Sequence, residues 1–441
     1  MKKYKGILGI IVFWLLIFAL VQYLSIQKTI ETSLTKSEAI AQGIVFYGVF
    51  VLIYLAIQVS FAHLEFLRKR KQGKSIKKAE KITGRHEKKT FEDSVSIIIP
   101  AYNEEPDILY SCIDSCRKQN IVDLEVLVID DGSVNRQVLI DDVYSKFNED
   151  PKVQVFYQEN RGKRHAQKLG FDHASKALIV TVDSDTIIHD SEGVLKLIQP
   201  LENEKVGAVT GDVRVENKNV NLVSKLISYR YWVAFNQERA AQSLCSVVMC
   251  CSGPFSVYRA EIIEEVKDKY IDQKFLGSYC TYGDDRHLTN LILSRDWQVE
   301  YNPFAEAFTY VPTNLSAYIK QQVRWNRSFY REMLWTLPFI YKKNIYLLYE
   351  LFMQFLLPIC LLLTLIYMLI LTSYQSTFIY LNSYLEILIL IALLRSLYGI
   401  YRTKDLGFIL FIIYGFIHIT ILVPVRLYSF LTLKSIRWGT R

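Results

Sequence analysis

Long apolar runs occupy both ends of this 441-residue chain, whereas the middle alternates short apolar segments with polar ones. A helix that crosses the hydrocarbon core of a bilayer needs about 20 apolar residues, and the terminal runs are of about that length. The first run has no small-residue cleavage site and is soon followed by a second, so two membrane spans fit better than a signal peptide. The runs lie at 6–26, 43–63, 345–371, 378–401 and 406–423. The pattern predicts one soluble domain between two sets of membrane helices.

The middle of the chain has the pattern of an α/β domain. Short runs rich in β-branched residues alternate with helical patterns, which favours a mostly parallel sheet. The predicted strands lie at 95–100, 124–129, 153–157, 178–182 and 247–251. In an open sheet of this kind, ligands bind in the crevice at the carboxyl ends of the strands. Polar residues that directly follow these strands are therefore candidates for a binding site.

Acidic residues follow two of the predicted strands directly. The strand at 124–129 leads into Asp130 and Asp131, and the strand at 178–182 leads into Asp183 and Asp185. Aspartates one residue apart can hold a hard divalent cation through oxygen and leave coordination positions for a diphosphate. A solvated turn is the alternative for such a pair taken alone.

Predicted helix starts carry the next charged candidates. Gly162 precedes Lys163 and Arg164, and a helix amino terminus with basic side chains beside it is suited to bind phosphate. Together with the paired aspartates, these residues predict a nucleotide-diphosphate and metal pocket at one sheet edge. Asp284 and Asp285 open a later helix, where an aspartate could also serve only as an N-cap.

A helix rich in basic and aromatic residues is predicted at 313–337, where Pro338 would stop it. Gln321, Arg324 and Trp325 are spaced so that they share one face of that helix. An amphipathic helix on the membrane surface is the alternative interpretation. Both roles are compatible if one face contacts lipid while these three side chains face the pocket.

Basic residues are concentrated directly after the second apolar run and provide much of the formal net charge of +8. Such a cluster favours the cytoplasmic side and its anionic lipids, so the middle domain is predicted to be cytoplasmic and the protein to lie in the cell membrane. Nucleic acid is not the expected partner, because the cluster adjoins a membrane span. The cluster comprises Arg68, Lys69, Arg70, Lys71, Lys74, Lys77, Lys78 and Lys81.

Seven cysteines lie among apolar neighbours or on the predicted cytosolic elements, and no CxxC pair occurs. Buried thiols in a reducing compartment fit this usage better than a zinc site. An odd number of carboxyl-terminal spans would place the end of the chain outside the cell, whereas its basic residues favour the inside. A re-entrant or split last apolar segment is therefore predicted.

Four of these motifs together resemble the processive, inverting, membrane-bound glycosyltransferases of family two. The motifs are Asp130-Asp131-Gly132, Asp183-Ser184-Asp185, Gly283-Asp284-Asp285 and Gln321-Gln322-Val323-Arg324-Trp325, the last being the QxxRW signature of that family. Within the family the chain is most similar to bacterial hyaluronan synthases of the streptococcal kind, through segments such as Gly162–Gln167, Glu238–Ser243 and the terminal Trp438-Gly439-Thr440-Arg441. The resemblance implies a GT-A-like, Rossmann-like cytosolic domain with a mostly parallel sheet, inserted between transmembrane helices.

The resemblance also implies a role for each candidate residue. Asp130, Asp131, Lys163 and Arg164 would bind the nucleotide of a UDP-sugar, while Asp183 and Asp185 would hold its diphosphate through Mg²⁺ or Mn²⁺. Asp285, with Asp284 beside it, would be the general base. Gln321, Arg324 and Trp325 would position the acceptor and steady the departing UDP. Trp438, Thr440 and Arg441 would belong to a segment that covers the loaded site.

The expected domain organisation follows from the runs and the motifs together. Two amino-terminal membrane helices are expected at 1–66, a basic linker at 67–93 and the glycosyltransferase domain at 94–312. Interface helices at 313–343, carboxyl-terminal membrane helices at 344–434 and a tail at 435–441 complete the chain.

The leading hypothesis is polymerisation of hyaluronan from UDP-N-acetylglucosamine and UDP-glucuronate, with export of the growing polysaccharide through the same membrane domain. A chitin-like, poly-N-acetylglucosamine or capsular polymer is the alternative within the same class. A transferase that loads a lipid carrier once and a non-catalytic sensor or export subunit remain as further alternatives. The complete set of acidic residues and the interfacial Gln-Arg-Trp helix favour processive catalysis.

Overall fold

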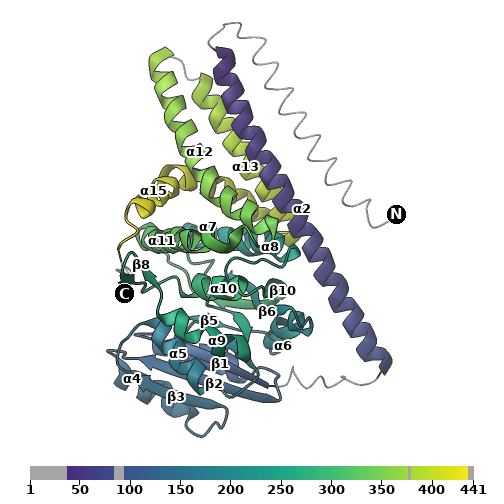
Figure 1. Cartoon of the computed structure of the whole chain (residues 1–441), viewed down its shortest axis with the longest axis vertical. Helices are drawn as coiled ribbons and strands as arrows, with labels where there is room; N and C mark the ends of the chain where they lie inside the picture. The colour runs from purple at the N-terminus through teal and green to yellow at the C-terminus, as the bar shows by residue number, and fades with distance from the viewer. Residues whose placement is uncertain (1–36, 84–93, 376–378, 436–441) are drawn as a thin grey trace.

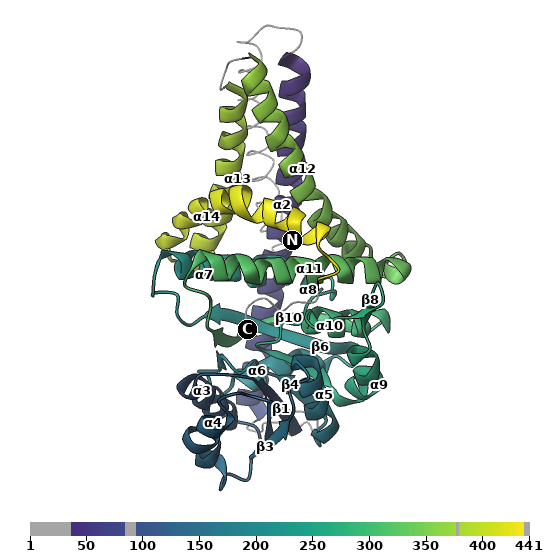
Figure 2. The ribbon, with the colours of Figure 1, turned by 90° about the vertical axis from the view of Figure 1, so that its left-hand side faces the viewer.

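The computed structural model describes residues 37–83, 94–375 and 379–435. Long helices stand side by side at one end of the molecule, the α/β domain lies at the other, and a layer of crosswise helices separates them (Figures 1 and 2). The long helices are α2 (Ser37–Thr83), α12 (Ile345–Gln375) and α13 (Ile379–Thr403). The crosswise layer contains α7 (Leu222–Val233), α8 (Ala240–Leu244) and α11 (Leu315–Ile340).

The α/β domain is built on an eight-stranded sheet of order β3-β2-β1-β4-β7-β6-β10-β5. Its strands are β1 (Ser94–Ala101), β2 (Asp123–Asp131), β3 (Val153–Gln158), β4 (Leu178–Thr181), β5 (Thr186–Ile187), β6 (Val206–Val215), β7 (Ser256–Arg259) and β10 (Gln298–Thr309). Strand β1 pairs in parallel with β2 and β4, β2 with β3, and β6 with β10. Strand β7 is antiparallel to both neighbours, as is β5 to β10. The prediction of an α/β domain with a mostly parallel sheet is therefore confirmed.

Helices cover the sheet and bury its apolar residues on both faces. Strands β1, β2 and β4 are almost fully buried, as expected for β-branched runs in a parallel sheet. The covering helices are α3 (Pro106–Arg117), α4 (Arg136–Asp142), α5 (Lys163–His173), α6 (Gly193–Ile198), α9 (Ala260–Ile271) and α10 (Asp284–Ser294). A two-stranded ribbon, β8 (Lys274–Phe275) with β9 (Ser278–Tyr279), precedes α10.

The prediction of a strand at 247–251 is wrong. Val247 forms only an isolated bridge to Val299, and the strand begins later, at Ser256. The backbone N–H of Cys251 donates to the side chain of Thr289, 2.8 Å away, instead of to a neighbouring strand. Ser252-Gly253-Pro254 then turns the chain, and a proline cannot donate to a ladder. These residues form a loop across the carboxyl edge of the sheet.

Helix α2 continues well beyond the predicted membrane span, so the linker expected at 67–93 is helical as far as Thr83. Arg68 pairs with Glu65 of the preceding turn, 2.6 Å away. Lys69 forms an ion pair with Glu300 of β10. The pair between Lys69 and Glu300 anchors the helix to the α/β domain. These contacts also engage two of the basic residues that were expected to meet lipid headgroups.

Helix α11 continues through Pro338 and ends at Ile340, although the sequence predicted that Pro338 would stop it. A proline removes one helical hydrogen bond and strains the turn before it. Because only two helical residues follow, that cost is limited to the last turn.

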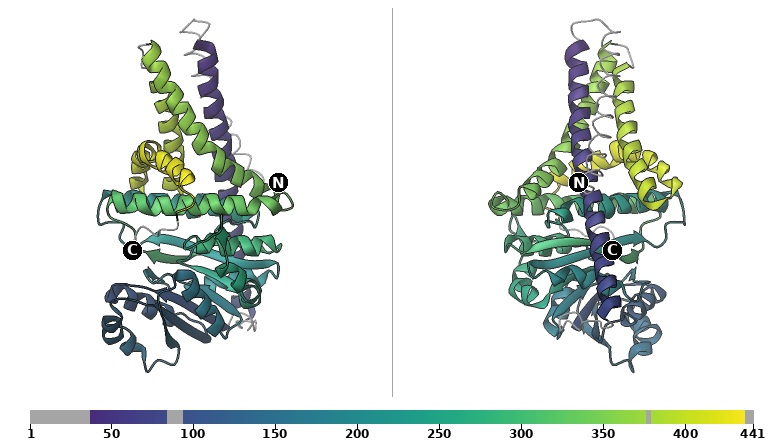
Figure 3. Two further views of the ribbon diagram at one scale, coloured as in Figure 1. Left: turned by 60° about the vertical axis from the view of Figure 1, so that its left-hand side comes forward. Right: turned by 90° about the vertical axis from the view of Figure 1, so that its right-hand side faces the viewer.

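Four described helices are long and apolar enough to cross a membrane: Gly48–Gly73, Ile345–Ile370, Tyr384–Thr403 and Leu406–Leu431. The predicted span at 6–26 lies outside the described residues. The last of the four is interrupted, with α14 (Phe411–Ile417) and α15 (Val423–Leu431) separated by a π-helical turn. Both pieces lie across the base of α12 and α13 instead of beside them (Figures 2 and 3). The π-helical turn thus divides the last apolar segment into two α-helical pieces, while its re-entrant or split course through the membrane stays a prediction.

Candidate active site

A cavity of about 1210 Å³ lies between the carboxyl edge of the sheet and helix α11. Its volume exceeds the roughly 300–1,000 Å³ typical of a site for one small ligand. Most of the candidate residues from the sequence line it, although they come from distant parts of the chain. These residues are Asp131, Lys163, Arg164, Asp183, Asp185, Asp284, Asp285, Gln321, Arg324 and Trp325.

The two aspartates at the end of β2 have different surroundings. Asp131 accepts hydrogen bonds from the backbone N–H groups of Arg161 and Gly162, each at 2.9 Å, and so shapes the loop that leads into α5. Asp130 does not line the cavity. It is fully buried and accepts hydrogen bonds from Arg136 at 2.9 Å and from the hydroxyl of Tyr144 at 3.1 Å. The expectation that Asp130 also contacts the nucleotide therefore needs correction, because its carboxylate is occupied by the fold.

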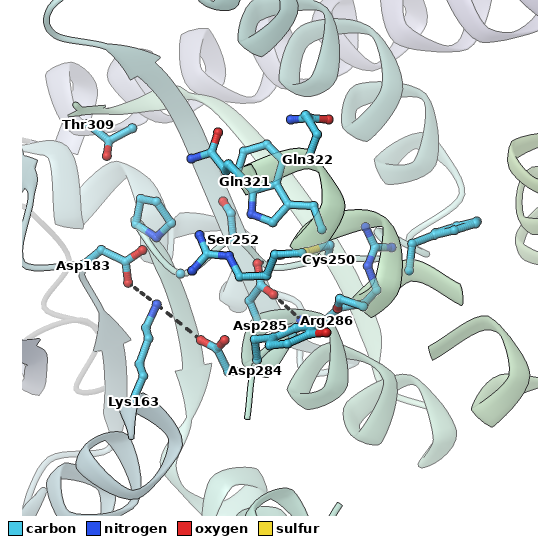
Figure 4. A pocket seen from close by; sticks show the side chains of 18 of the residues that line it. Lys163, Asp183, Cys250, Ser252, Asp284, Asp285, Arg286, Thr309, Gln321 and Gln322 are labelled. Atoms are coloured by element: carbon cyan, nitrogen blue, oxygen red, sulfur yellow. Dashed lines mark hydrogen bonds and ion pairs between the residues drawn. The ribbon is translucent and has the colours of Figure 1, made fainter. Parts of the chain in front are cut away.

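Lys163, the first residue of α5, connects the two acidic motifs (Figure 4). Its Nζ lies 2.5 Å from Oδ1 of Asp183 and 3.3 Å from Oδ2 of Asp284. Burial alone would lower the pKa of Lys163, but the two carboxylates raise it above its ordinary value. The ammonium therefore stays charged within the cavity.

Arg164 also lines the cavity but is almost fully buried. Its guanidinium donates to the carbonyl of Tyr270 at 3.1 Å, to Oε1 of Gln273 at 2.6 Å and to the carbonyl of Tyr282 at 3.3 Å. These bonds engage both terminal nitrogens of the guanidinium and fix the surrounding loops, whereas its buried Nε has no hydrogen-bond partner among the described residues.

Asp183 and Asp185 face the cavity at the end of β4 with too little positive charge around them. Burial, together with the nearby carboxylates of Asp183 and Glu104, raises the pKa of Asp185 to about 7. Its Oδ1 accepts a hydrogen bond from Thr309, 3.1 Å away. A Cβ atom at Gly253 would lie 2.9 Å from both Asp183 and Lys163, so this glycine keeps the space beside them open. An excess of buried carboxylate next to open space fits a bound cation.

The donor set matches a divalent cation that is only partly held by protein. Within residues 37–83, 94–375 and 379–435, no group of three or more His, Cys, Asp or Glu side chains is arranged to hold a metal. Mg²⁺ typically binds through one or two carboxylates and completes its shell with water and substrate phosphate. Asp183 and Asp185 satisfy that requirement.

Asp284 and Asp285 begin α10 and have opposite pKa shifts. Burial and the neighbouring Asp284 carboxylate raise the pKa of Asp285. Burial would also raise the pKa of Asp284, but the charges of Lys163 and Arg164 outweigh it and lower that pKa. Adjacent acids with separated pKa values can take different roles, one as a charge partner and the other as a proton acceptor.

Helix α11 forms the wall of the cavity opposite the sheet. Gly283 has a φ of +86°, and a side chain there would collide with Ser328 of α11, so the loop before Asp284 packs tightly against this helix. Trp325 is 41 % exposed, with its ring 6.2 Å from that of Tyr231. Oε1 of Gln321 is buried and has no hydrogen-bond partner among the described residues, which leaves it available to a ligand.

Comparisons with known proteins show which family has this sequence. Residues 96–267 match the model of the family "Glycosyl transferase family 2". A hyaluronan synthase from Streptococcus pyogenes is 34% identical over 400 residues, which cover 90% of this chain and 90% of the relative. An N-acetylglucosaminyltransferase from Neorhizobium galegae is 35% identical over 350 residues, covering 79% of this chain and 80% of the relative.

The chain belongs to glycosyl transferase family 2. It is therefore a glycosyltransferase, and with four apolar helices among its described residues it is a membrane protein. A mannosyltransferase from Pyrobaculum calidifontis, solved with GDP-Man and Mn²⁺, has the same fold at 18% identity. The match has a TM-score of 0.51 and covers 82% of this chain and 97% of that one. The GT-A-like fold predicted from the sequence is confirmed.

Sequence reasoning missed the membrane-side wall of the cavity in this glycosyltransferase. Tyr231 and Arg239 line it from α7 and the π-helical turn at Ala234–Arg239, and His418 and Arg426 line it from the split last segment. π-Helical turns occur frequently at functional sites, but the one at 234–239 has no separate sequence signature. Two signals in the sequence pointed to this region without assigning it: the resemblance of the segment at 238–243 to hyaluronan synthases, and the ionisable His418 and Arg426 in or beside an apolar run, where such groups are costly unless they line a polar path or pair with each other.

The proposed covering residues Trp438, Thr440 and Arg441 lie outside the described residues. The chain just before them is held at the cavity rim. The hydroxyl of Tyr282, a cavity residue, donates to the carbonyl of Ser435 at 2.6 Å. Arg331 of α11 donates to the same carbonyl at 2.7 Å.

Proposed function

We propose that this glycosyltransferase polymerises hyaluronan from UDP-N-acetylglucosamine and UDP-glucuronate and exports the product across the cell membrane. The observation that carries the proposal is one cavity that joins three parts. These are an acidic pocket suited to a cation-bound diphosphate, an exposed tryptophan suited to a sugar acceptor and a polar wall toward the membrane helices. A single-transfer enzyme would not need the third part. The similarity to hyaluronan synthases over 90% of the chain supports the same conclusion.

In the proposed reaction Asp285 is the general base. Its carboxylate takes the proton from the acceptor hydroxyl while that oxygen attacks the anomeric carbon of the donor. The bond between the anomeric carbon and the diphosphate oxygen breaks in the same step, so UDP leaves and the configuration inverts. A positioned base of this kind contributes roughly a hundred- to ten-thousandfold in rate. The raised pKa of Asp285 supports its choice over Asp284, because it makes Asp285 the better proton acceptor.

The departing UDP accumulates negative charge, which the donor side of the cavity must stabilise. A divalent cation, Mg²⁺ or Mn²⁺, held by Asp183 and Asp185 would neutralise part of that charge. Lys163 remains protonated next to Asp183 and binds the diphosphate from the other side. Arg324 of α11 approaches from the acceptor side of the same cavity. Asp131 holds the loop at 158–162 in place for the nucleotide.

On the acceptor side, Trp325 offers an apolar ring face to a sugar, and Gln321 offers an unpaired carbonyl oxygen. Beyond them the cavity continues to α14 and α15 at the base of the long helices. We assign this continuation to the start of the polymer exit path. The basic residues after the apolar part of α2 favour a cytoplasmic position for the catalytic domain.

Three cavity arginines support an anionic sugar in the product. Arg239, Arg286 and Arg426 line the cavity, and none forms an ion pair with a described residue. Guanidinium groups bind carboxylates in a planar, two-pronged geometry, and each glucuronate carries one carboxylate. A polymer of N-acetylglucosamine alone carries no carboxylate for these guanidinium groups to bind. That polymer is the second candidate, because N-acetylglucosaminyltransferases are as similar in sequence as hyaluronan synthases.

Donor dependence separates the two candidates. The purified protein, with Mg²⁺ or Mn²⁺, is supplied with each UDP-sugar alone and with both together. Hyaluronan synthesis requires both donors for long product, and hyaluronidase degrades that product. Long product from UDP-N-acetylglucosamine alone, resistant to hyaluronidase, would establish the second candidate instead.

A further inference from the structure

The loop between α8 and β7 brings a thiol to the proposed general base. Cys250 lines the cavity, and its side chain is 7 % exposed. Its Sγ lies 3.3 Å from Oδ2 of Asp285, as a hydrogen bond from thiol to carboxylate requires (Figure 4). Nothing in the sequence patterns singled out this cysteine.

Two further hydrogen bonds fix the loop against α10, the helix that carries Asp285. The backbone N–H of Cys251 donates to Oγ1 of Thr289 at 2.8 Å, and that hydroxyl donates to the carbonyl of Asp285 at 2.7 Å. On the other side of the loop, Arg239 donates to the carbonyl of Cys250 at 3.1 Å. The distance between the thiol and the carboxylate is therefore set by the backbone of both partners.

The carboxylate of Asp285 is held at both oxygens. Oδ1 accepts from the backbone N–H of Arg286 at 2.8 Å, and Oδ2 accepts from Cys250. The remaining charged groups that act on it are Asp284 beside it, the side chain of Arg286 and Lys163 across the cavity. Without the thiol, Oδ2 would have no donor among the described residues and the carboxylate could rotate about its Cβ–Cγ bond.

We infer that Cys250 is a positioning residue for this reaction, whose thiol holds the Asp285 carboxylate in the orientation that accepts the proton of the acceptor hydroxyl. The inference rests on the proposed function, because it takes Asp285 as the base. Cys250 itself touches no reacting atom. Its role is distinct from that of a thiol nucleophile, since burial and Asp285 raise the pKa of Cys250 to about 12 and keep it protonated as a donor.

Loss of the Cys250 thiol as a hydrogen-bond donor should shift the pKa of Asp285, whereas loss of a side chain that only packs there should not. A hydrogen bond to a carboxylate favours its charged form, so its loss raises the pKa of Asp285. The base is active when deprotonated, and the acid limb of the pH profile of kcat should therefore move to higher pH. Because a thiol is a weak donor, we expect a shift of about half a pH unit in Cys250→Ala. Cys250→Ser restores a donor and should return the limb toward its original position.

The test measures kcat against pH for the full-length protein with both UDP-sugars and Mn²⁺. Four variants are compared with the parent: Cys250→Ala, Cys250→Val, Cys250→Ser and Cys251→Ala. Cys250→Val replaces the thiol with a somewhat larger apolar group that cannot donate, and covers the case in which the alanine variant does not fold. Cys251 is a buried cysteine of the same loop that does not line the cavity, so Cys251→Ala is the matched control.

We expect the acid limb of the kcat profile to move to higher pH in Cys250→Ala and Cys250→Val. It should return toward its original pH in Cys250→Ser and should not move in Cys251→Ala. An unchanged acid limb in both Cys250→Ala and Cys250→Val would overturn the inference, as would an equal shift in Cys251→Ala. Asp285→Asn separates this failure from a failure of the proposed function. If Asp285→Asn retains polymer synthesis, the base assignment is wrong and the role of Cys250 fails with it. If Asp285→Asn is inactive while the Cys250 profiles do not move, only the role of Cys250 is wrong.

Discussion

The ammonium of Lys163 lies 2.5 Å from Oδ1 of Asp183, and so joins the amino terminus of α5 to the acidic end of β4. The same nitrogen lies 3.3 Å from Asp284, the first residue of α10. One cation therefore compensates carboxylates from two motifs that are far apart in the chain. This arrangement makes Lys163 central to the charge balance of the donor side.

Replacing Lys163 with alanine should weaken donor binding more than it slows the chemical step. Losing one partner of a partly buried charge pair leaves the carboxylates uncompensated, which typically costs about 2 kcal/mol or more. We therefore expect KM for both UDP-sugars to rise by about tenfold or more. Lys168→Ala is the control, because Lys168 lies on the same helix but pairs with Asp172 and Asp268 outside the cavity. Equal KM values in the two variants would contradict the role of Lys163.

Removal of divalent cations should abolish transfer, and added Mn²⁺ or Mg²⁺ should restore it. Asp183 and Asp185 are the candidate ligands, so Asp185→Asn should raise the metal concentration needed for half-maximal activity. Asp190→Asn changes an aspartate that pairs with Lys196 outside the cavity, and it should keep the metal dependence of the parent. UDP release measured across a metal titration tests both points. Full activity in excess chelator would exclude a metal role for the Asp183 pair.

Asp285→Asn should lower turnover by about a hundred- to ten-thousandfold, because the amide cannot accept the proton of the acceptor hydroxyl. Binding of UDP should be nearly unchanged, since Lys163 and the Asp183 pair remain. Calorimetric titration with UDP and a polymer assay measure the two effects separately. Asp268→Asn, an exposed substitution, should alter neither. Loss of UDP binding in Asp285→Asn would assign the residue to the donor site instead.

Glu332 should contribute strongly to stability. It is 2 % exposed and lies on α11, where it accepts hydrogen bonds from Asn290 at 2.8 Å and from Gln273, with Nδ1 of His287 3.2 Å away. Glu332→Ala would leave these groups buried without a partner, at a cost of about 3 kcal/mol. A clearly lower melting temperature is expected, whereas Glu264→Ala, at an exposed position, should have little effect.

The contribution of Glu332 should also depend on pH. Burial would raise its pKa, but His287 and the hydrogen bonds to its carboxylate lower it below the ordinary value of 4.5. A lowered pKa in the folded state means that the stabilisation is present above pH 4.5 and is lost as the pH falls through the folded-state value. The difference in melting temperature between the parent and Glu332→Gln should therefore shrink below pH 4.5. If the difference in melting temperature grows as the pH falls, the predicted direction of the pH dependence is wrong.

Local patterns were enough to identify most of the cavity residues. Asp131, Asp183 and Asp185 end neighbouring parts of a parallel sheet, and the carboxyl ends of parallel strands meet at one edge. Gln321, Arg324 and Trp325 share a helical face because their spacing matches the helical repeat. Whether these side chains act as assigned remains a prediction, since their placement in one cavity does not test their roles.

Other features depended on contacts between distant segments. Asp130 and Asp131 are adjacent on a strand and point to opposite faces, so only the packing of Tyr144 and Arg136 around Asp130 decides that Asp131 is the one that lines the cavity. The ion pair between Lys69 and Glu300 holds the helix that continues through 67–83 against a strand far along the chain. Cys250 reaches Asp285 only because the loop at 248–255 leaves the sheet.

The sequence by itself determined the family, the α/β domain between apolar helices and the acidic, basic and aromatic residues available for chemistry. These properties follow from periodicity and residue type, which act over a few residues. The tertiary structure alone decided which carboxylates share Lys163, which aspartate at the end of β2 lines the cavity and how the split last segment closes the cavity on the membrane side. Such choices depend on burial and on charges brought together from far along the chain, and no local pattern encodes the distance between them.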